Sequence, residues 1–179
     1  GYLDALRPDP RVTIVRDDGP FNFAVLHNRA IGQVRGDVVV LLNNDTEVIG
    51  PDWLERLVAH AVRPGVGAVG AKLYFPDDTI QHAGVFLGVR GTAVHLHAHR
   101  RRDDPGPHGL LTVARNLTAV TGACLAIRRA LYAEVGGLNE AFMVDFNDID
   151  LCLRLRRRGY QVIWEPKAEL YHVEAATRG

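Results

Sequence analysis

Three groups of polar side chains in this sequence have residue types and spacings that suit chemistry. The first is Asn43-Asn44-Asp45-Thr46-Glu47, which directly follows an apolar run over residues 38–42. Ligands of open α/β sheets bind outside the carboxyl ends of strands, and carboxylate, amide and hydroxyl oxygens are suitable ligands for Mg²⁺ or Mn²⁺. A polar turn uses the same residue types, so a metal site and a turn are both open interpretations.

The second group is acidic, with Asp145, Asp148 and Asp150 at the expected start of a helix over residues 148–158. Acids in this position cap the helix and suit the positive end of its dipole. Alternatively, one of them is a general base that points into a cleft. Because Asp148 and Asp150 are two residues apart, they do not share a helix face. If one is the base, the other must have a different task.

The third group consists of histidines. His172 follows the last expected strand, and it becomes a candidate ligand only if the fold brings it beside the first group; a structural histidine is the simpler interpretation. His95, His97 and His99 alternate, so on a strand their side chains would face one way and could bind zinc. Since three arginines follow at once and no cysteine is nearby, a polar loop is favoured over a zinc site.

The elements that would position these groups alternate between strand and helix. Apolar and β-branched runs predict strands over residues 12–15, 37–42 and 66–75, and a polar loop is expected over 43–50. Pro51 suits the first position of a helix with one apolar stripe. This alternation predicts an α/β fold with a mostly parallel central sheet flanked by helices.

The composition of the whole chain excludes several classes of protein. Lys+Arg and Asp+Glu are both 21, so no net field favours nucleic acid or an anionic membrane. No apolar run reaches the roughly 18 residues of a transmembrane helix. The two cysteines form neither a C-x-x-C pair nor a disulfide framework. We therefore expect a reduced, cytoplasmic protein with no transmembrane segment and no nucleic-acid partner.

Several short motifs occur in an order and spacing that resemble one family over nearly the whole chain. They are Phe21-Asn22-Phe23 with Asn28; Gly36-Asp37 with Leu41 to Glu47; Ile80-Gln81-His82-Ala83-Gly84; Thr121-Gly122-Ala123-Cys124; Gly136-Gly137-Leu138; and Asn147 to Arg154 with Gly159-Tyr160, Pro166 and His172. In these motifs the chain resembles glycosyltransferase family two, of the Rossmann-like GT-A (nucleotide-diphospho-sugar transferase) fold. It looks most similar to bacterial rhamnosyltransferase-like, O-antigen and cell-surface polysaccharide transferases.

The resemblance implies a role for each matching residue. Asp45 aligns with the last acid of the family's D-x-D motif, which holds Mg²⁺ or Mn²⁺ at the donor diphosphate, and His172 aligns with a further metal ligand of some members. Asp148 aligns with the catalytic base of the family's E-D motif. The implied donor-binding residues are Asn22, Asn28, Asn43, Asn44 and Asp45, and the implied acceptor and diphosphate residues are Gly122, Asn147, Asp150 and Arg154.

The chain departs from the family pattern at two of these positions. Asn43 stands where the first acid of the D-x-D motif usually stands, which leaves one charge fewer at the metal, and Asn147 replaces the Glu of the E-D motif. An inverting transfer is one displacement at the anomeric carbon, which needs one base and a Lewis acid on the leaving diphosphate. The alternative is a catalytically incomplete relative that binds nucleotide, sugar or a partner domain.

The resemblance also implies a domain organisation. Residues 1–179 would form the C-terminal two thirds of a single, N-terminally truncated catalytic domain, with a donor and metal half over 1–50 and an acceptor and catalytic half over 51–179. Residues 90–110, rich in Gly, Pro and charge, predict a mobile loop that borders the acceptor side. The implied partners are a nucleotide-diphosphate sugar donor, a saccharide or lipid-linked saccharide acceptor, and further domains in a full-length protein that works at the inner face of the membrane.

Overall fold

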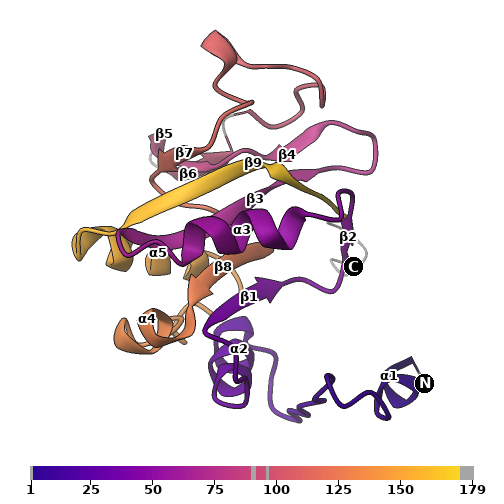
Figure 1. The fold of residues 1–179 in the computed structure, drawn as a ribbon. Helices are drawn as coiled ribbons and strands as arrows, with labels where there is room; N and C mark the ends of the chain where they lie inside the picture. Colours follow the sequence, from indigo (N-terminus) through magenta and orange to yellow (C-terminus); the bar gives the residue numbers. More distant parts are fainter. Residues whose placement is uncertain (1, 90–91, 96, 174–179) are drawn as a thin grey trace.

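The computed structural model describes residues 2–89, 92–95 and 97–173 (Figure 1). Its helices are α1 (Tyr2–Leu6), α2 (Phe23–Ile31), α3 (Trp53–Ala61), α4 (Arg129–Glu134), α5 (Asn147–Arg157) and the 3₁₀ helix η1 (Pro107–Gly109). Its strands are β1 (Val38–Leu42), β2 (Thr46–Val48), β3 (Val66–Tyr74), β4 (Ile80–His82), β5 (Val85–Val89), β6 (Thr92–His95), β7 (Arg115–Leu117), β8 (Cys124–Arg128) and β9 (Gln161–His172). Among the described residues, no helix is both long and apolar enough to cross a bilayer.

One mixed sheet forms the centre of the fold. Its strands lie in the order β1-β8-β3-β9-β2, with β4 added to β3 and β7 added to β9, while β5 and β6 form a separate hairpin. β3 and β9 are parallel, whereas β1–β8, β3–β8, β2–β9, β3–β4 and β7–β9 are antiparallel. The predicted α/β class is confirmed, but the prediction of a mostly parallel sheet is wrong for the part of the chain that the structure describes.

The insertion of β8 explains this difference. β1 and β3 both pair antiparallel with β8, so they run in the same direction, and the chain between them passes through α3 as in a parallel crossover. The local pattern would place β1 and β3 side by side. In the structure, β8, which begins only at Cys124, lies between them. Because β9 is parallel to β3, the carboxyl ends of β1, β3 and β9 point the same way.

Three other expectations differ from the structure. Residues 12–15 form no strand, because a β-branched run needs a neighbouring strand to complete its hydrogen bonds. The expected loop over 43–50 contains β2, and the expected loop over 90–110 contains β6 and η1. These strands have only three and four residues, which is too short for an alternating pattern to show. Residues 90, 91 and 96 of the second loop lie outside the described residues.

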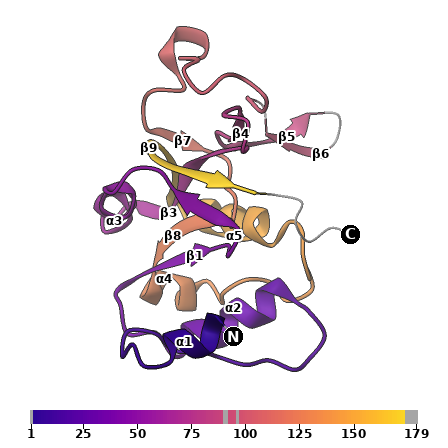
Figure 2. The same ribbon diagram turned by 90° about the vertical axis from the view of Figure 1, so that its right-hand side faces the viewer.

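Two hydrophobic cores lie on opposite faces of β3, whose nine residues are all buried. Val69 and Leu73 of β3 pack with Leu57 of α3 on one face, and Ala68 of β3 packs with Leu151 of α5 on the other. This alternation follows from the two-residue period of a strand. Figure 1 shows α3 in front of the sheet with α5 behind it, and Figure 2 shows the two helices on opposite sides. In both views, α1 and α2 lie at the end of the molecule opposite to η1.

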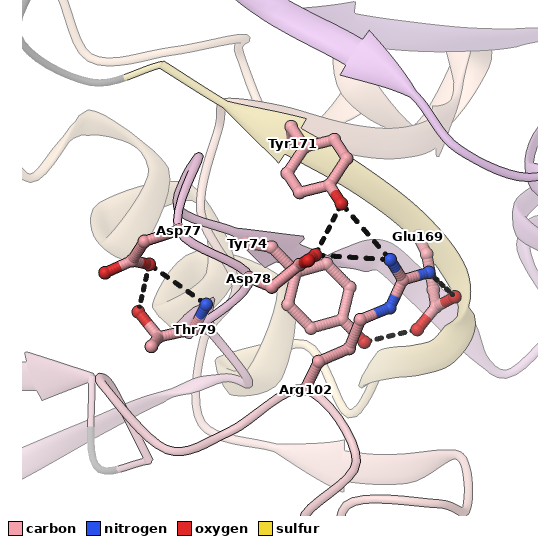
Figure 3. Close-up of polar contacts among 7 residues, drawn as sticks. All are labelled: Tyr74, Asp77, Asp78, Thr79, Arg102, Glu169 and Tyr171. Carbon is pink, nitrogen blue, oxygen red and sulfur yellow. Dashed lines mark hydrogen bonds and ion pairs between the residues drawn. The ribbon is translucent and has the colours of Figure 1, made fainter.

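A charged network holds the segment before η1 against the sheet (Figure 3). Arg102 donates hydrogen bonds of 3.2 Å to Glu169 and to the Tyr171 hydroxyl, and its guanidinium lies 5.0 Å from the centre of the Tyr74 ring. The Tyr74 hydroxyl donates to Glu169, and the Tyr171 hydroxyl donates to Asp78. The expected loop is therefore anchored to β9 at Arg102, and its mobility stays a prediction.

Gly84 allows the chain to turn between β4 and β5 next to Leu117. It has φ +99°, and a Cβ atom placed there would lie 2.1 Å from Cδ1 of Leu117. We expect Gly84→Ala to lower the free energy of unfolding by about 2–4 kcal/mol, since a strained backbone and an overpacked contact add up. Urea denaturation followed by circular dichroism measures this loss.

Gly88 provides a matched control for this substitution. It also has a positive φ, +84°, but no atom of the residues that the structure describes lies within 4 Å of a Cβ placed there. Gly88→Ala should therefore show the cost of the backbone conformation alone, about 1–2 kcal/mol. Equal losses for the two variants would show that the contact with Leu117 adds nothing.

Candidate active site

The Asn43–Asp45 turn follows the carboxyl end of β1 and is held on both sides. The N–H of Asn43 donates to the carbonyl of Ala123 (3.0 Å), and the N–H of Val173 donates to the carbonyl of Asp45 (2.9 Å). Directly after the turn, β2 pairs antiparallel with the end of β9 at His172. The turn is therefore fixed between the start of β8 and the end of β9.

The side chains of Asp45 and His172 meet at this corner. Oδ1 of Asp45 lies 3.2 Å from Nε2 of His172, and Nδ2 of Asn43 also lies 3.2 Å from that ring nitrogen. The His172 side chain is 11% exposed and that of Asp45 is 25% exposed. The expected convergence of Asp45 and His172 is confirmed. Their role as metal ligands stays a prediction.

The chemistry of this corner fits a hard divalent cation. Oδ1 of Asp45 is buried and has no hydrogen-bond partner among the described residues, although buried polar atoms are normally paired. Carboxylate oxygen and imidazole nitrogen both ligate transition-metal ions such as Mn²⁺. Within residues 2–89, 92–95 and 97–173, no three His, Cys, Asp or Glu side chains gather as a metal site. The remaining coordination positions would therefore be taken by amides, ligand oxygens and water.

Asp148 lies in the first turn of α5 and contacts the segment that also holds the Asn43–Asp45 turn. Its Oδ2 accepts the N–H of Gly122 (2.7 Å), and its Oδ1 accepts the N–H of Ile149 (2.7 Å). Ala123, the residue after Gly122, supplies the carbonyl that accepts the N–H of Asn43. This shared segment supports a common site for Asp148 and Asp45, and the role of Asp148 as base stays a prediction.

Asp150 has a different contact, as expected for a residue two positions from Asp148. Nε of Arg154 donates to Oδ2 of Asp150 (2.7 Å), and the same guanidinium donates to the carbonyls of Val135 and Gly137 at 2.7 Å each. The two bonds from Arg154 to these carbonyls tie α5 to the chain that follows α4. The side chain of Asn147, which is 3% exposed as a residue, donates to the carbonyl three positions earlier (2.8 Å). An acceptor or diphosphate role for these three residues stays a prediction.

The predicted donor residues of α2 connect that helix to the segment after α4. Asn22 caps α2 and donates to the carbonyl of Glu140 (2.9 Å). Asn28 donates to the carbonyl of Leu138 (2.9 Å) and accepts its N–H (2.9 Å). A hollow of about 400 Å³ lies beside Asn28 and is lined in part by Leu138 and Glu140. Asn44 is exposed, and a donor contact for these asparagines stays a prediction.

The structure does not bring His95, His97 and His99 together as a zinc site. His95 lies beside His82 with 3.1 Å between the Nδ1 atoms, His97 meets the edge of the Phe86 ring, and His99 stacks on the Phe75 ring. Three separate partners explain why the alternating spacing does not produce a three-ligand cluster within the part of the chain that the structure describes.

Two buried residues of the site, Gln81 and His82, were not predicted. Gln81 contacts both the ring and the backbone of His172. Nε2 of His82 accepts the N–H of Thr121 (3.3 Å), and burial holds the pKa of His82 well below its usual range. The ring of His82 is therefore neutral and supports the residue before Gly122. Two adjacent polar residues in a short, otherwise apolar segment were the signal that could have identified them.

Comparison with known proteins places this site in a family context. A family model described as "Glycosyltransferase like family 2" matches residues 4–178. The chain is 53% identical over 172 residues to an uncharacterized protein, y4gI, of Sinorhizobium fredii, and 42% identical over 172 residues to the O-antigen biosynthesis protein RfbC of Myxococcus xanthus. It is 26% identical over 203 residues to an N-acetylglucosaminyl-diphospho-decaprenol L-rhamnosyltransferase of Mycobacterium tuberculosis.

These alignments cover most of the chain but only part of each relative. They include 96%, 95% and 98% of the chain, in the same order. The chain spans 19%, 13% and 63% of the lengths of these relatives.

Solved structures show the same fold at low sequence identity. The crystal structure of GalNAc-T7 with UDP, GalNAc and Mn²⁺ matches 98% of this chain and 35% of its own, with a TM-score of 0.75 and 15% identity. A mannosyltransferase of Pyrobaculum calidifontis in complex with GDP-Man and Mn²⁺ matches 99% of this chain and 44% of its own, with a TM-score of 0.67 and 19% identity. The fold is therefore GT-A-like, with the mixed sheet described above.

Proposed function

Because this chain belongs to the glycosyltransferase-like family 2, we propose that it transfers a sugar, with inversion, from a nucleotide-diphosphate sugar to a hydroxyl group. The acceptor is a saccharide or a lipid-linked saccharide of cell-surface polysaccharide synthesis. One relative is named for O-antigen biosynthesis and another for rhamnosyl transfer to a diphospho-decaprenol-linked sugar. These names support the proposed class of acceptor.

The observation that carries this proposal is the contact between Asp45 and His172. The side chains of a turn residue and a strand residue meet at 3.2 Å, and within the described part of the chain the carboxylate oxygen of the pair is buried without a hydrogen-bond partner. The family resemblance implies that the same two residues hold the metal ion that binds the donor diphosphate. The pairing of β2 with β9 holds them in contact.

In the proposed reaction, the bond from the anomeric carbon to the diphosphate oxygen breaks while the acceptor oxygen bonds to the opposite face. Asp148 accepts the proton of the acceptor hydroxyl, and the N–H of Gly122 orients its carboxylate. A single displacement forms no covalent enzyme intermediate, so no second carboxylate is needed as nucleophile, in contrast to a retaining hydrolase. A divalent cation held by Asp45 and His172 would supply charge neutralisation to the leaving diphosphate.

Replacing Asn43 with Asp is expected to strengthen Mn²⁺ binding by about tenfold or more, which corresponds to roughly 1.4 kcal/mol. The amide nitrogen of Asn43 lies 3.2 Å from Nε2 of His172, so its N–H competes for the lone pair that a metal needs. Asn43→Asp removes this donor and adds a negative charge. Mn²⁺ titration followed by electron paramagnetic resonance measures the affinity.

Asn44→Asp is the control for the added charge. Asn44 is exposed in the same turn, so a charge there acts through solvent and should change Mn²⁺ affinity only about twofold. Equal strengthening by both variants would show a general charge effect. Weaker binding by Asn43→Asp would contradict the assignment of this corner to the metal.

A catalytically incomplete domain that binds nucleotide or sugar is the second candidate. It is favoured by Asn43, an amide where the family's first metal-binding acid usually stands. The two candidates differ in the release of nucleoside diphosphate from a panel of nucleotide-sugars by the full-length protein. The proposed enzyme releases nucleoside diphosphate from at least one donor, loses this activity in EDTA and recovers it with Mn²⁺. Binding of donors without any turnover would favour the second candidate.

A further inference from the structure

We propose that Gln81 is a positioning residue that fixes the His172 ring in the tautomer whose Nε2 is available to a divalent cation. This inference rests on the proposed function, since it concerns the same metal-binding corner. Gln81 lies in β4 and is 5% exposed, and His172 is the last residue of β9. Neither the motif that contains Gln81 nor the family resemblance gives it this task.

The geometry shows two contacts from one amide to one residue. Nε2 of Gln81 lies 3.2 Å from the backbone carbonyl oxygen of His172. Oε1 of Gln81 lies 2.7 Å from Nδ1 of the His172 ring. The amide therefore holds both the ring and the backbone at the end of β9.

These two contacts determine the tautomer of the ring. A backbone carbonyl only accepts hydrogen bonds, so the atom of Gln81 that faces it must be the NH₂ group. The carbonyl oxygen of the amide then faces Nδ1, and because this oxygen also only accepts, Nδ1 must carry a hydrogen. In a neutral imidazole the other nitrogen, Nε2, then presents a lone pair. The backbone carbonyl of His172 can only accept a hydrogen bond, and it therefore sets the orientation of the Gln81 amide.

Two side chains face Nε2, and the donor among them matches a lone pair on this atom. Nδ2 of Asn43, a donor, lies 3.2 Å from Nε2. Oδ1 of Asp45, an acceptor, lies 3.2 Å from Nε2 and, within residues 2–89, 92–95 and 97–173, is buried without a hydrogen-bond partner. A lone pair and a buried carboxylate oxygen that face each other are both satisfied by a shared cation. Gln81 thus has the position of an outer-shell partner, which orients a metal-binding histidine through its second nitrogen.

The experiment compares Gln81→Leu with wild type in the full-length protein, with Mn²⁺ alone as the probe. Mn²⁺ affinity is measured by electron paramagnetic resonance, and electron spin-echo modulation reports whether an imidazole nitrogen binds the ion. We expect Gln81→Leu to weaken Mn²⁺ binding by about 10–100-fold, the usual effect of losing an outer-shell partner, and to reduce the nitrogen signal. Affinity and nitrogen signal equal to wild type would overturn the proposal.

Two further variants separate positioning from packing. Gln161→Leu makes the same chemical change at an exposed residue of β9 and should leave Mn²⁺ affinity unchanged. Gln81→Glu keeps an oxygen that accepts the Nδ1 hydrogen, so its Mn²⁺ affinity should stay within about threefold of wild type. If Gln81→Glu binds Mn²⁺ as weakly as Gln81→Leu, the side chain acts through packing and the proposal is overturned. If circular dichroism shows that Gln81→Leu is unfolded, Gln81→Glu alone decides, and an Mn²⁺ affinity more than about tenfold weaker than wild type then overturns the proposal.

His172→Ala distinguishes a failure of this inference from a failure of the proposed function. If His172→Ala loses the nitrogen signal and Gln81→Leu does not, only the role of Gln81 is wrong. If His172→Ala binds Mn²⁺ like wild type with the same signal, the metal role of this corner is wrong, and the inference about Gln81 fails with it.

Discussion

Asp148→Asn is expected to reduce turnover by about 10²–10⁴-fold in the full-length protein, the usual contribution of a general base. The amide keeps the shape of the carboxylate, and its oxygen can still accept the N–H of Gly122, which lies 2.7 Å from Oδ2 of Asp148. It cannot accept the proton of an acceptor hydroxyl. Donor binding should change little. Nucleoside-diphosphate release measures turnover, and isothermal titration measures donor affinity.

Asp150→Asn is the matched control on the same helix. Asp150 pairs with Arg154 at 2.7 Å within α5, and the same guanidinium holds α5 to the chain after α4 through two backbone carbonyls. The loss of the Asp150 charge should cost about 0.5–1 kcal/mol of stability and change turnover by less than about threefold. If Asp150→Asn is inactive and Asp148→Asn is active, the general base is Asp150. If both variants remain active, the reaction uses a different base.

Asp45→Asn is expected to weaken Mn²⁺ binding at least about 100-fold, the upper end of what the loss of an outer-shell partner costs. The substitution keeps the shape of the side chain and removes the buried charge whose Oδ1 lies 3.2 Å from Nε2 of His172. Turnover should fall with it, because the leaving diphosphate loses charge neutralisation. The Mn²⁺ concentration that gives half-maximal activity measures the effect.

Asp52→Asn provides the control for this loss. Asp52 forms an exposed ion pair with Arg56 at the start of α3, so its substitution changes the same charge away from the corner of Asp45 and His172. In Asp52→Asn, the Mn²⁺ concentration that gives half-maximal activity should stay within about twofold of the wild-type value. An unchanged Mn²⁺ requirement in Asp45→Asn would remove this residue from the metal site.

The sequence predicts the strands and helices that have a long hydrophobic pattern. It also predicts which polar residues lie at the ends of these strands. Apolar runs and helical spacing predict a strand over 37–42, a helix that begins at Pro51 and a strand over 66–75. The structure confirms these three elements as β1, α3 and β3, although α3 begins only at Trp53. Because β1 and β9 run in the same direction, their ends bring Asp45 and His172 together as predicted.

Features that depend on strand partners were not predictable from local pattern. β2 has three residues and forms only because β9 completes its hydrogen bonds. β8 lies between β1 and β3 because of long-range packing, so the sheet is mixed and the prediction of a mostly parallel sheet was wrong. The contacts of Gln81 with His172 join positions 91 residues apart, and no spacing rule in the sequence connects them.

The anomeric configuration of the transferred sugar tests the central claim most directly. It is measured by proton NMR on the product that the full-length protein forms from the donor identified by nucleoside-diphosphate release. A single displacement with Asp148 as base inverts the anomeric carbon, so the account predicts a configuration opposite to that of the donor. A product with the configuration of the donor would contradict the account, because retention by two displacements requires a nucleophile that the proposed site does not assign.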